Sequence, residues 1–97
     1  MAESWFLPGA EEDYTDALNW YRERSPQAAA GFEAAVEVGL ERIEKSPESY
    51  PIGEKRHRYY NLRHYPYSLI YRILPDKILV AAVAHSSREP GYWHTRA

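Results

Sequence analysis

The chain of 97 residues contains no cysteine and only three lysines, and its five glycines are isolated from one another. The absence of cysteine excludes a disulfide framework and a thiolate metal site, and it fits a reducing compartment. Scattered glycines exclude a glycine-rich phosphate-binding loop. The longest apolar run, Ile78 to Ala84, is far shorter than the roughly 20 residues of a membrane helix. The first residues lack the basic and apolar regions of a secretory signal, so we expect a cytoplasmic protein.

The length and composition fit one domain spanning residues 1–97. Hydrophobic residues make up 44% of the chain and aromatic residues 14%, which suffices for a packed core without crosslinks. The four histidines are far apart in the sequence and have no paired ligand spacing or adjacent acids. We therefore expect neither a metal site nor a cofactor.

Acidic residues are nearly absent from the second part of the chain, although the net charge is only −2. Met1 to Glu54 holds twelve acids and four bases, whereas Lys55 to Ala97 holds two acids and eight bases. Such asymmetry indicates either a basic face that meets an acidic partner or anion, or a solvated basic sheet beside acidic helices. The candidate binding residues all lie in the basic part: Arg58, Arg63, Arg72, Trp93 and Arg96.

The first half of the chain predicts a short strand and a helix hairpin. Ser4 to Leu7 reads as a strand stopped by Pro8-Gly9, and a helix is expected from about Ala10 to Arg24. Ser25-Pro26 then caps a second helix that runs to about Lys45. Each helix carries one apolar stripe, which faces either its own sheet or a coiled-coil partner. We expect small residues to let the helix axes approach closely, namely Ala17, Ala28, Ala35 and Gly39.

The second half predicts three consecutive strands, at His57 to Arg63, Tyr67 to Leu74 and Lys77 to His85. The third is apolar on both faces from Ile78 to Ala84, which places it in the middle of the sheet. The predicted class is α+β: an N-terminal strand, an antiparallel helix hairpin and a three-stranded antiparallel meander, with the helices on one face. The predicted core includes four residues on apolar faces, Trp5, Phe32, Leu69 and Val80.

Three stretches together carry a family resemblance across most of the chain. The first comprises the Ser25-Pro26-Gln27-Ala28 link and the helix end Ile43 to Pro47; the second is Leu62 to Arg72; the third is His85 to Arg96. In this order they resemble the RelE/ParE superfamily of bacterial toxins, in the branch called plasmid-stabilisation proteins. The resemblance implies a small RNase-like toxin fold and an antitoxin partner whose flexible arm wraps the toxin in a hetero-oligomer. It leaves two targets open, because some relatives cleave mRNA on the ribosome whereas ParE relatives block DNA gyrase.

Most of the residues that nuclease chemistry needs are missing from this chain, and few are present. Cleavage through the 2′-hydroxyl needs a general acid, a general base and cations that stabilise the phosphate. The cation positions of ribosome-dependent relatives carry uncharged residues in this chain, Tyr59, Asn61, Ser68 and Ser86. Only the late tyrosine remains, as Tyr92, with Arg88 nearby. The sequence pI near 6.1 also disfavours ribosome binding, which relies on neutralising several phosphates.

A different nuclease set is still conceivable, with His85 as acid or base, Arg88 and Arg63 on the phosphate and Tyr92 as proton donor. The structural alternatives are that His85 bonds a carbonyl at the sheet edge and that Arg88 pairs with Glu89 or the terminal carboxylate. Tyr92 and Trp93 would then hold the C-terminal segment on the sheet. Three functions follow: a gyrase inhibitor controlled by an acidic, amphipathic, helical antitoxin tail, which we favour; a ribosome-dependent mRNA endonuclease; or a non-toxic relative that binds an antitoxin.

Overall fold

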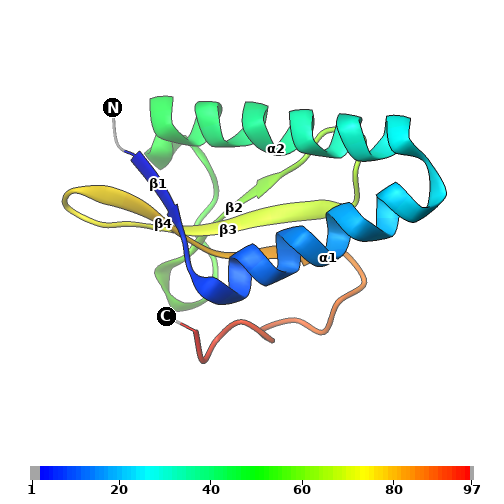
Figure 1. Cartoon of the computed structure of the whole chain (residues 1–97). Helices are drawn as coiled ribbons and strands as arrows, with labels where there is room; N and C mark the ends of the chain where they lie inside the picture. The colour runs from blue at the N-terminus through cyan, green and yellow to red at the C-terminus, as the bar shows by residue number, and fades with distance from the viewer. Residues whose placement is uncertain (1–2, 97) are drawn as a thin grey trace.

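The computed structural model describes residues 3–96, and the order of its elements agrees with the α+β class predicted above (Figure 1). Two helices follow the first strand, and three strands follow the helices. Two 3-10 turns, Pro47–Ser49 and Glu54–Arg56, lie in the connection between them. The main elements are β1 (Glu3–Phe6), α1 (Pro8–Arg24), α2 (Pro26–Lys45), β2 (Arg58–Asn61), β3 (Tyr67–Ile73) and β4 (Lys77–His85).

The strands form one mixed sheet in the order β1-β4-β3-β2. The last three strands are antiparallel neighbours, as the predicted meander requires, whereas β1 joins the far side of β4 in parallel. The strand that is apolar on both faces, β4, therefore lies inside the sheet, flanked by β1 and β3. Both helices cover one face of this sheet, and the C-terminal segment crosses the other (Figure 1). Among the described residues, no helix is long and apolar enough to cross a membrane.

Local sequence accounts for the ends of both helices. α1 begins at Pro8, two residues before the predicted start, because proline fits the first helical position, where a backbone N–H has no partner. The Ser25 hydroxyl accepts the Ala28 N–H at 3.2 Å and caps α2, as predicted. α2 ends at Lys45. With one residue between them, the helices form the expected hairpin.

The larger core lies between the helices and the sheet. Phe32, Leu69 and Val80 are completely buried there, which confirms three of the four predicted core residues. Trp5 was wrongly placed, because its side chain is 54% exposed. In β1 it is Phe6 that turns toward the helices, where it contacts Tyr14 edge-on. Trp5 alternates to the opposite face, and the Lys77 ammonium lies 4.8 Å from its ring centroid.

Two other details differ from the predictions. Gly39 does not serve the approach of the two helices, because a β-carbon there would lie 2.8 Å from a ring carbon of Tyr60, so its small size admits β2. β2 is also shorter than predicted and ends at Asn61. The chain turns after it, and His64 takes a left-handed φ of 67°. The alternation of side chains that predicted a longer strand continues into this turn, but the pairing of β2 with β3 ends at Asn61.

Candidate functional site

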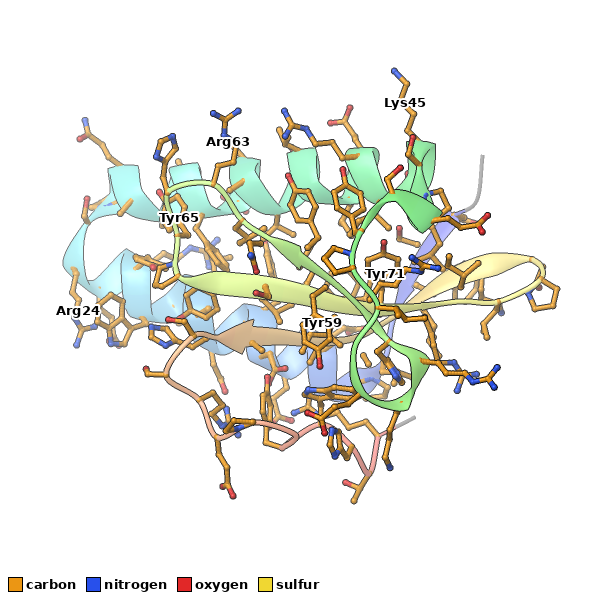
Figure 2. All side chains as sticks on the ribbon, turned by 180° about the vertical axis from the view of Figure 1, so that it is seen from behind. Arg24, Lys45, Tyr59, Arg63, Tyr65 and Tyr71 are labelled. Atoms are coloured by element: carbon orange, nitrogen blue, oxygen red, sulfur yellow. The ribbon has the colours of Figure 1, made fainter. Side chains whose placement is uncertain are left out.

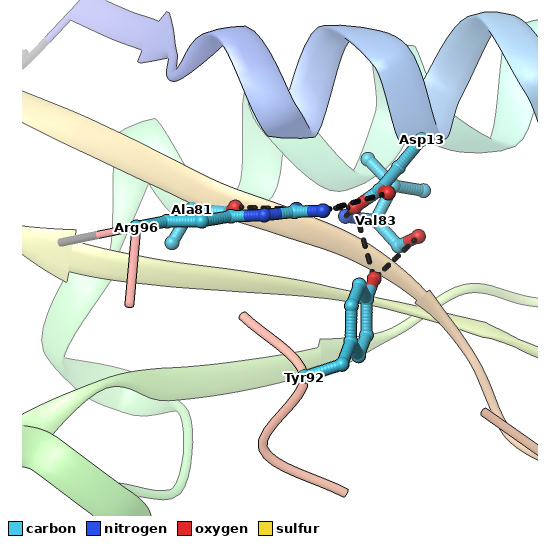
Figure 3. Close-up of polar contacts among 5 residues, drawn as sticks. All are labelled: Asp13, Ala81, Val83, Tyr92 and Arg96. Atoms are coloured by element: carbon cyan, nitrogen blue, oxygen red, sulfur yellow. Dashed lines mark hydrogen bonds and ion pairs between the residues drawn. The ribbon is translucent and has the colours of Figure 1, made fainter. Parts of the chain in front are cut away.

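The carboxylate of Asp13 joins three distant parts of the chain at the edge of β4 (Figure 3). β1 leaves this edge at Phe6, so the backbone groups of β4 beyond Val80 need other partners. The Val83 N–H donates to Asp13 Oδ2 at 3.1 Å. Arg96 donates to both carboxylate oxygens, at 2.7 and 3.2 Å, and to the Ala81 carbonyl at 3.1 Å. Side chains thus complete the strand edge where β1 ends, and Asp13 is only 9% exposed.

Tyr92 belongs to the same cluster. Its hydroxyl donates to Asp13 Oδ2 at 2.9 Å and lies 3.5 Å from the Val83 carbonyl oxygen (Figure 3). Burial and the hydrogen bond to Asp13 raise the pKa of Tyr92 above its usual value, because both disfavour the phenolate. A phenol with a raised pKa gives up its proton less readily, so the cluster makes Tyr92 a weaker acid.

His85 and Arg88 lie beside Tyr92, and the three side chains share a shallow hollow of about 190 Å³. The His85 Nδ1 accepts the Ser87 N–H at 3.0 Å and lies 2.7 Å from the Ser87 hydroxyl. The Arg88 guanidinium stacks on the Tyr92 ring, 3.9 Å from its centroid. Within residues 3–96 Arg88 forms no ion pair with Glu89, and the terminal Ala97 lies outside the described residues.

A larger hollow of about 530 Å³ opens on the other side of His85 and Arg88, toward α1. Trp20 and Tyr67 contribute aromatic surface to it, and Asp13 and Asp16 contribute two carboxylates. Asp13 is compensated by Arg96, whereas Asp16 has no cation as a partner among the described residues. The hollow thus combines cationic and anionic groups. A site of this kind repels phosphate more than a uniformly basic one does.

Three of the predicted binding residues are engaged in contacts within the protein. Trp93 is 2% exposed and packs in a small second core with Ile70, Ala81 and Ala82. Arg58 donates to the carbonyls of Glu48 and Tyr50, at 3.1 and 2.8 Å. Arg96 is held by Asp13, as described above. The other two, Arg63 and Arg72, instead line separate hollows on the surface.

Arg63 lines a mainly apolar groove of about 340 Å³ between α2 and the loop that follows β2. We call it the α2 groove. In Figure 2 Arg63 and Tyr65 lie on that loop beside α2. Val38, which is 40% exposed, contributes apolar surface, and the Tyr65 hydroxyl donates to the Ala28 carbonyl at 2.8 Å. The groove is lined by Gly31, Ala34, Ala35, Val38, Tyr60, Arg63, His64 and Tyr65.

Sequence reasoning missed two residues near the site. Asp13 was not singled out, although it lies three residues after Ala10 and four before Ala17. A carboxylate on the apolar stripe of a helix was the signal that it would be buried and paired. His57 was not singled out either. It is 1% exposed, stacks near Trp93 with 4.5 Å between ring centroids, and its pKa is lowered chiefly by burial.

No group of three or more His, Asp or Glu side chains within residues 3–96 is arranged to hold a metal ion. The contacts described above are hydrogen bonds, an ion pair and aromatic and apolar contacts. These are the interactions that protein recognition uses.

Comparison with known proteins places this architecture in a family. Residues 6–90 match the model of the ParE toxin of type II toxin-antitoxin system, parDE. Toxin RelE3 of Caulobacter vibrioides is 30% identical over 84 residues, which cover 81% of this chain and 88% of that protein. Toxin ParE2 of Mycobacterium tuberculosis is 28% identical over 83 residues, or 84% of this chain and 79% of that protein.

The fold has also been seen in a solved structure. A chain from the chromosomal ParDE TA system from P. aeruginosa superposes with a TM-score of 0.75, covering 88% of this chain and 96% of that one. At 15% identity this match concerns the fold alone. The family model spans most of the sequence. The chain therefore belongs to the ParE toxin family, within the RelE/ParE superfamily of type II toxin–antitoxin toxins.

Proposed function

We propose that this toxin acts by binding DNA gyrase through its surface and not by cleaving RNA. The observation that carries the proposal is the hydrogen bond of 2.9 Å from the Tyr92 hydroxyl to Asp13. Tyr92 is the side chain that matches the tyrosine of the nuclease relatives, and this hydrogen bond engages it in a structural contact. With its pKa raised by burial and by Asp13, Tyr92 is a poor proton donor to a leaving group.

The strand positions where nuclease relatives carry cations support the same conclusion. Asn61 and Ser68 face each other across β2 and β3, and the Ser68 hydroxyl donates to Asn61 Oδ1 at 2.6 Å. This uncharged pair offers no positive charge to a phosphate. The nearby carboxylate of Asp16 adds a repulsive charge in the larger hollow. A protein target needs none of these cations, since interfaces depend mainly on packed anchors.

The antitoxin is proposed to bind in the α2 groove. Its apolar lining and rim of Arg63 and His64 fit an amphipathic helical segment with acidic side chains at its edge. The exposed Val38 and Ala34 lie four residues apart on α2 and present a continuous apolar strip. Since gyrase and such an antitoxin are both cytoplasmic, the cytoplasm is the proposed site of action.

We expect the purified toxin to inhibit supercoiling of relaxed plasmid by bacterial DNA gyrase, and the protein encoded by the neighbouring gene to relieve this inhibition. The variants His85→Ala and Arg88→Ala should each weaken the inhibition only modestly, because neither group does chemistry in this mechanism and most side chains of a binding surface contribute little individually. Electrophoresis of plasmid topoisomers measures the effect. The toxin–antitoxin complex purified intact is the matched control, since it contains the same chain in neutralised form.

Primer extension on messages from induced cells tests the alternatives directly. Cuts at codon boundaries that disappear with His85→Ala would contradict the gyrase mechanism, because loss of a general acid or base costs about 10²-fold or more in rate. If the purified toxin does not inhibit gyrase and induction of the toxin in cells does not arrest growth, the non-toxic alternative replaces the proposal.

The α2 groove makes a separate prediction for the antitoxin. Val38→Glu should weaken the complex by at least about 30-fold, because it places a charge at an apolar anchor and meets the acidic segment with like charge. Asn19→Glu, on the exposed face of α1, introduces the same charge away from the groove and should leave the affinity unchanged. Isothermal titration against the neighbouring-gene product measures both. Equal affinity for the two variants would exclude the α2 groove as the binding site.

A further inference from the structure

A fourth hollow, of about 360 Å³, lies at the opposite end of β2 from the α2 groove. Four of its lining side chains are cationic and none is acidic, although the chain as a whole is slightly acidic. Two isoleucines flank the cations, with Ile52 58% and Ile73 39% exposed. We call this surface the basic corner; its lining residues are Ile52, Lys55, Arg56, Arg58, Arg72 and Ile73.

Two residues of the basic corner have a strained backbone conformation. Lys55 and Arg56 are consecutive non-glycine residues with left-handed φ values of 52° and 62°. Such conformations are uncommon for non-glycine residues and collect at functional sites. The Lys55 ammonium donates to the His94 carbonyl at 3.2 Å, and Arg58 is held by two carbonyls. Within residues 3–96 Arg56 and Arg72 form neither a side-chain hydrogen bond nor an ion pair, so both remain available.

We infer that the basic corner binds an acidic segment of the antitoxin, as a second contact beyond the α2 groove; this inference rests on the proposed function. The aliphatic flanks favour a peptide, because Ile52 and Ile73 suit an apolar side chain between acidic ones. Single-stranded nucleic acid is usually stacked on aromatic rings. Trp5 is an aromatic residue at this end of the same sheet face. It pairs with Leu79 of β4, which in turn pairs with Arg72 of β3. The Lys77 ammonium already lies over the Trp5 ring.

The position of β2 explains how one arm reaches both sites. β2 is an edge strand, with Arg58 of the basic corner at its start and Arg63 of the α2 groove just beyond its end. β2 itself spans four residues, or roughly 13 Å of extended chain, and the chain turns before Arg63. Residues 51–53 pair with the outer edge at the start of β2, so an antitoxin arm that leaves the α2 groove has to pass over this paired segment to reach the basic corner. Two linked contacts then reinforce each other, because the second forms at a high effective concentration.

The test compares two double variants of the full-length toxin, Arg56→Gln with Arg72→Gln, and Arg22→Gln with Arg24→Gln at the end of α1. Each removes two positive charges. Titration with the neighbouring-gene antitoxin at low salt should show a dissociation constant about 10-fold or more higher for the first pair only. High salt should reduce that difference, since exposed charges are screened. Equal melting temperatures check that both variants are folded.

The outcomes separate this inference from the proposed function. If the wild type binds the antitoxin and both double variants bind equally well, the basic corner is excluded while the toxin–antitoxin pairing stands. If the wild type forms no complex, the pairing fails and the inference with it. A twelve-nucleotide oligouridylate that binds the wild type but not the Arg56→Gln, Arg72→Gln variant, without competing with the antitoxin, would also overturn it in favour of an RNA contact.

Discussion

Replacing Phe32 by alanine should lower the free energy of unfolding by about 3–5 kcal/mol, as large-to-small changes in a packed core do. The ring is completely buried, and the rings of Tyr14, Tyr21, Tyr65 and Tyr67 surround it with centroids 5.7, 5.3, 5.7 and 5.2 Å away. These partners come from α1, from the loop after β2 and from β3. Removing the ring leaves a cavity that none of these elements can fill without moving the others. Urea denaturation followed by circular dichroism measures the loss.

Val38→Ala is the matched control for this prediction. It removes apolar atoms from the same helix, but Val38 is 40% exposed and its loss should cost less than about 1 kcal/mol. A similar small cost for Phe32→Ala would show that the aromatic cluster does not hold the hairpin on the sheet. The packing described for the larger core would then be wrong.

Substituting Asp13 by alanine should cost about 3 kcal/mol and release the C-terminal segment. Removing one member of a buried pair leaves the other groups without their partner, and here these are the Arg96 guanidinium, the Tyr92 hydroxyl and the Val83 N–H. Asp16→Ala, one turn along α1, removes a carboxylate that forms no side-chain hydrogen bond with the described residues and should have little effect on stability. Denaturant unfolding measures both variants.

Hydrogen exchange distinguishes a local effect from general destabilisation. In the Asp13 variant, peptides covering 86–96 and the end of β4 should lose protection before the helices do, because the contacts removed all lie there. The opposite result, with stability changed by less than about 1 kcal/mol and exchange unaltered, would mean that Trp93 and its apolar contacts alone retain the segment. Tyr92 would then be freer to act as an acid than we propose.

The sequence by itself determined the features that depend on neighbouring residues. The Ser25-Pro26 cap and the apolar stripes predicted the two helices. The uninterrupted apolar run predicted the central strand, and β4 spans Lys77–His85 as expected. These signals are local because helix capping and strand patterning act over a few residues. The family resemblance depended on the helix link and helix end, on Leu62 to Arg72 and on His85 to Arg96, and the family-model match confirmed it.

Only the tertiary structure decided which side of short elements is buried and which polar groups meet. Trp5 and Phe6 are both aromatic, and in a strand of four residues the alternation allows either of them to face the helices. Pairing with β4, more than seventy residues away in the sequence, turned Phe6 toward the core. Asp13 meets its partners because β1 ends at Phe6 and leaves the edge of β4 without a strand partner. Buried hydrogen bonds of this kind join residues that no local pattern connects, since the need for a partner arises only when the chain folds.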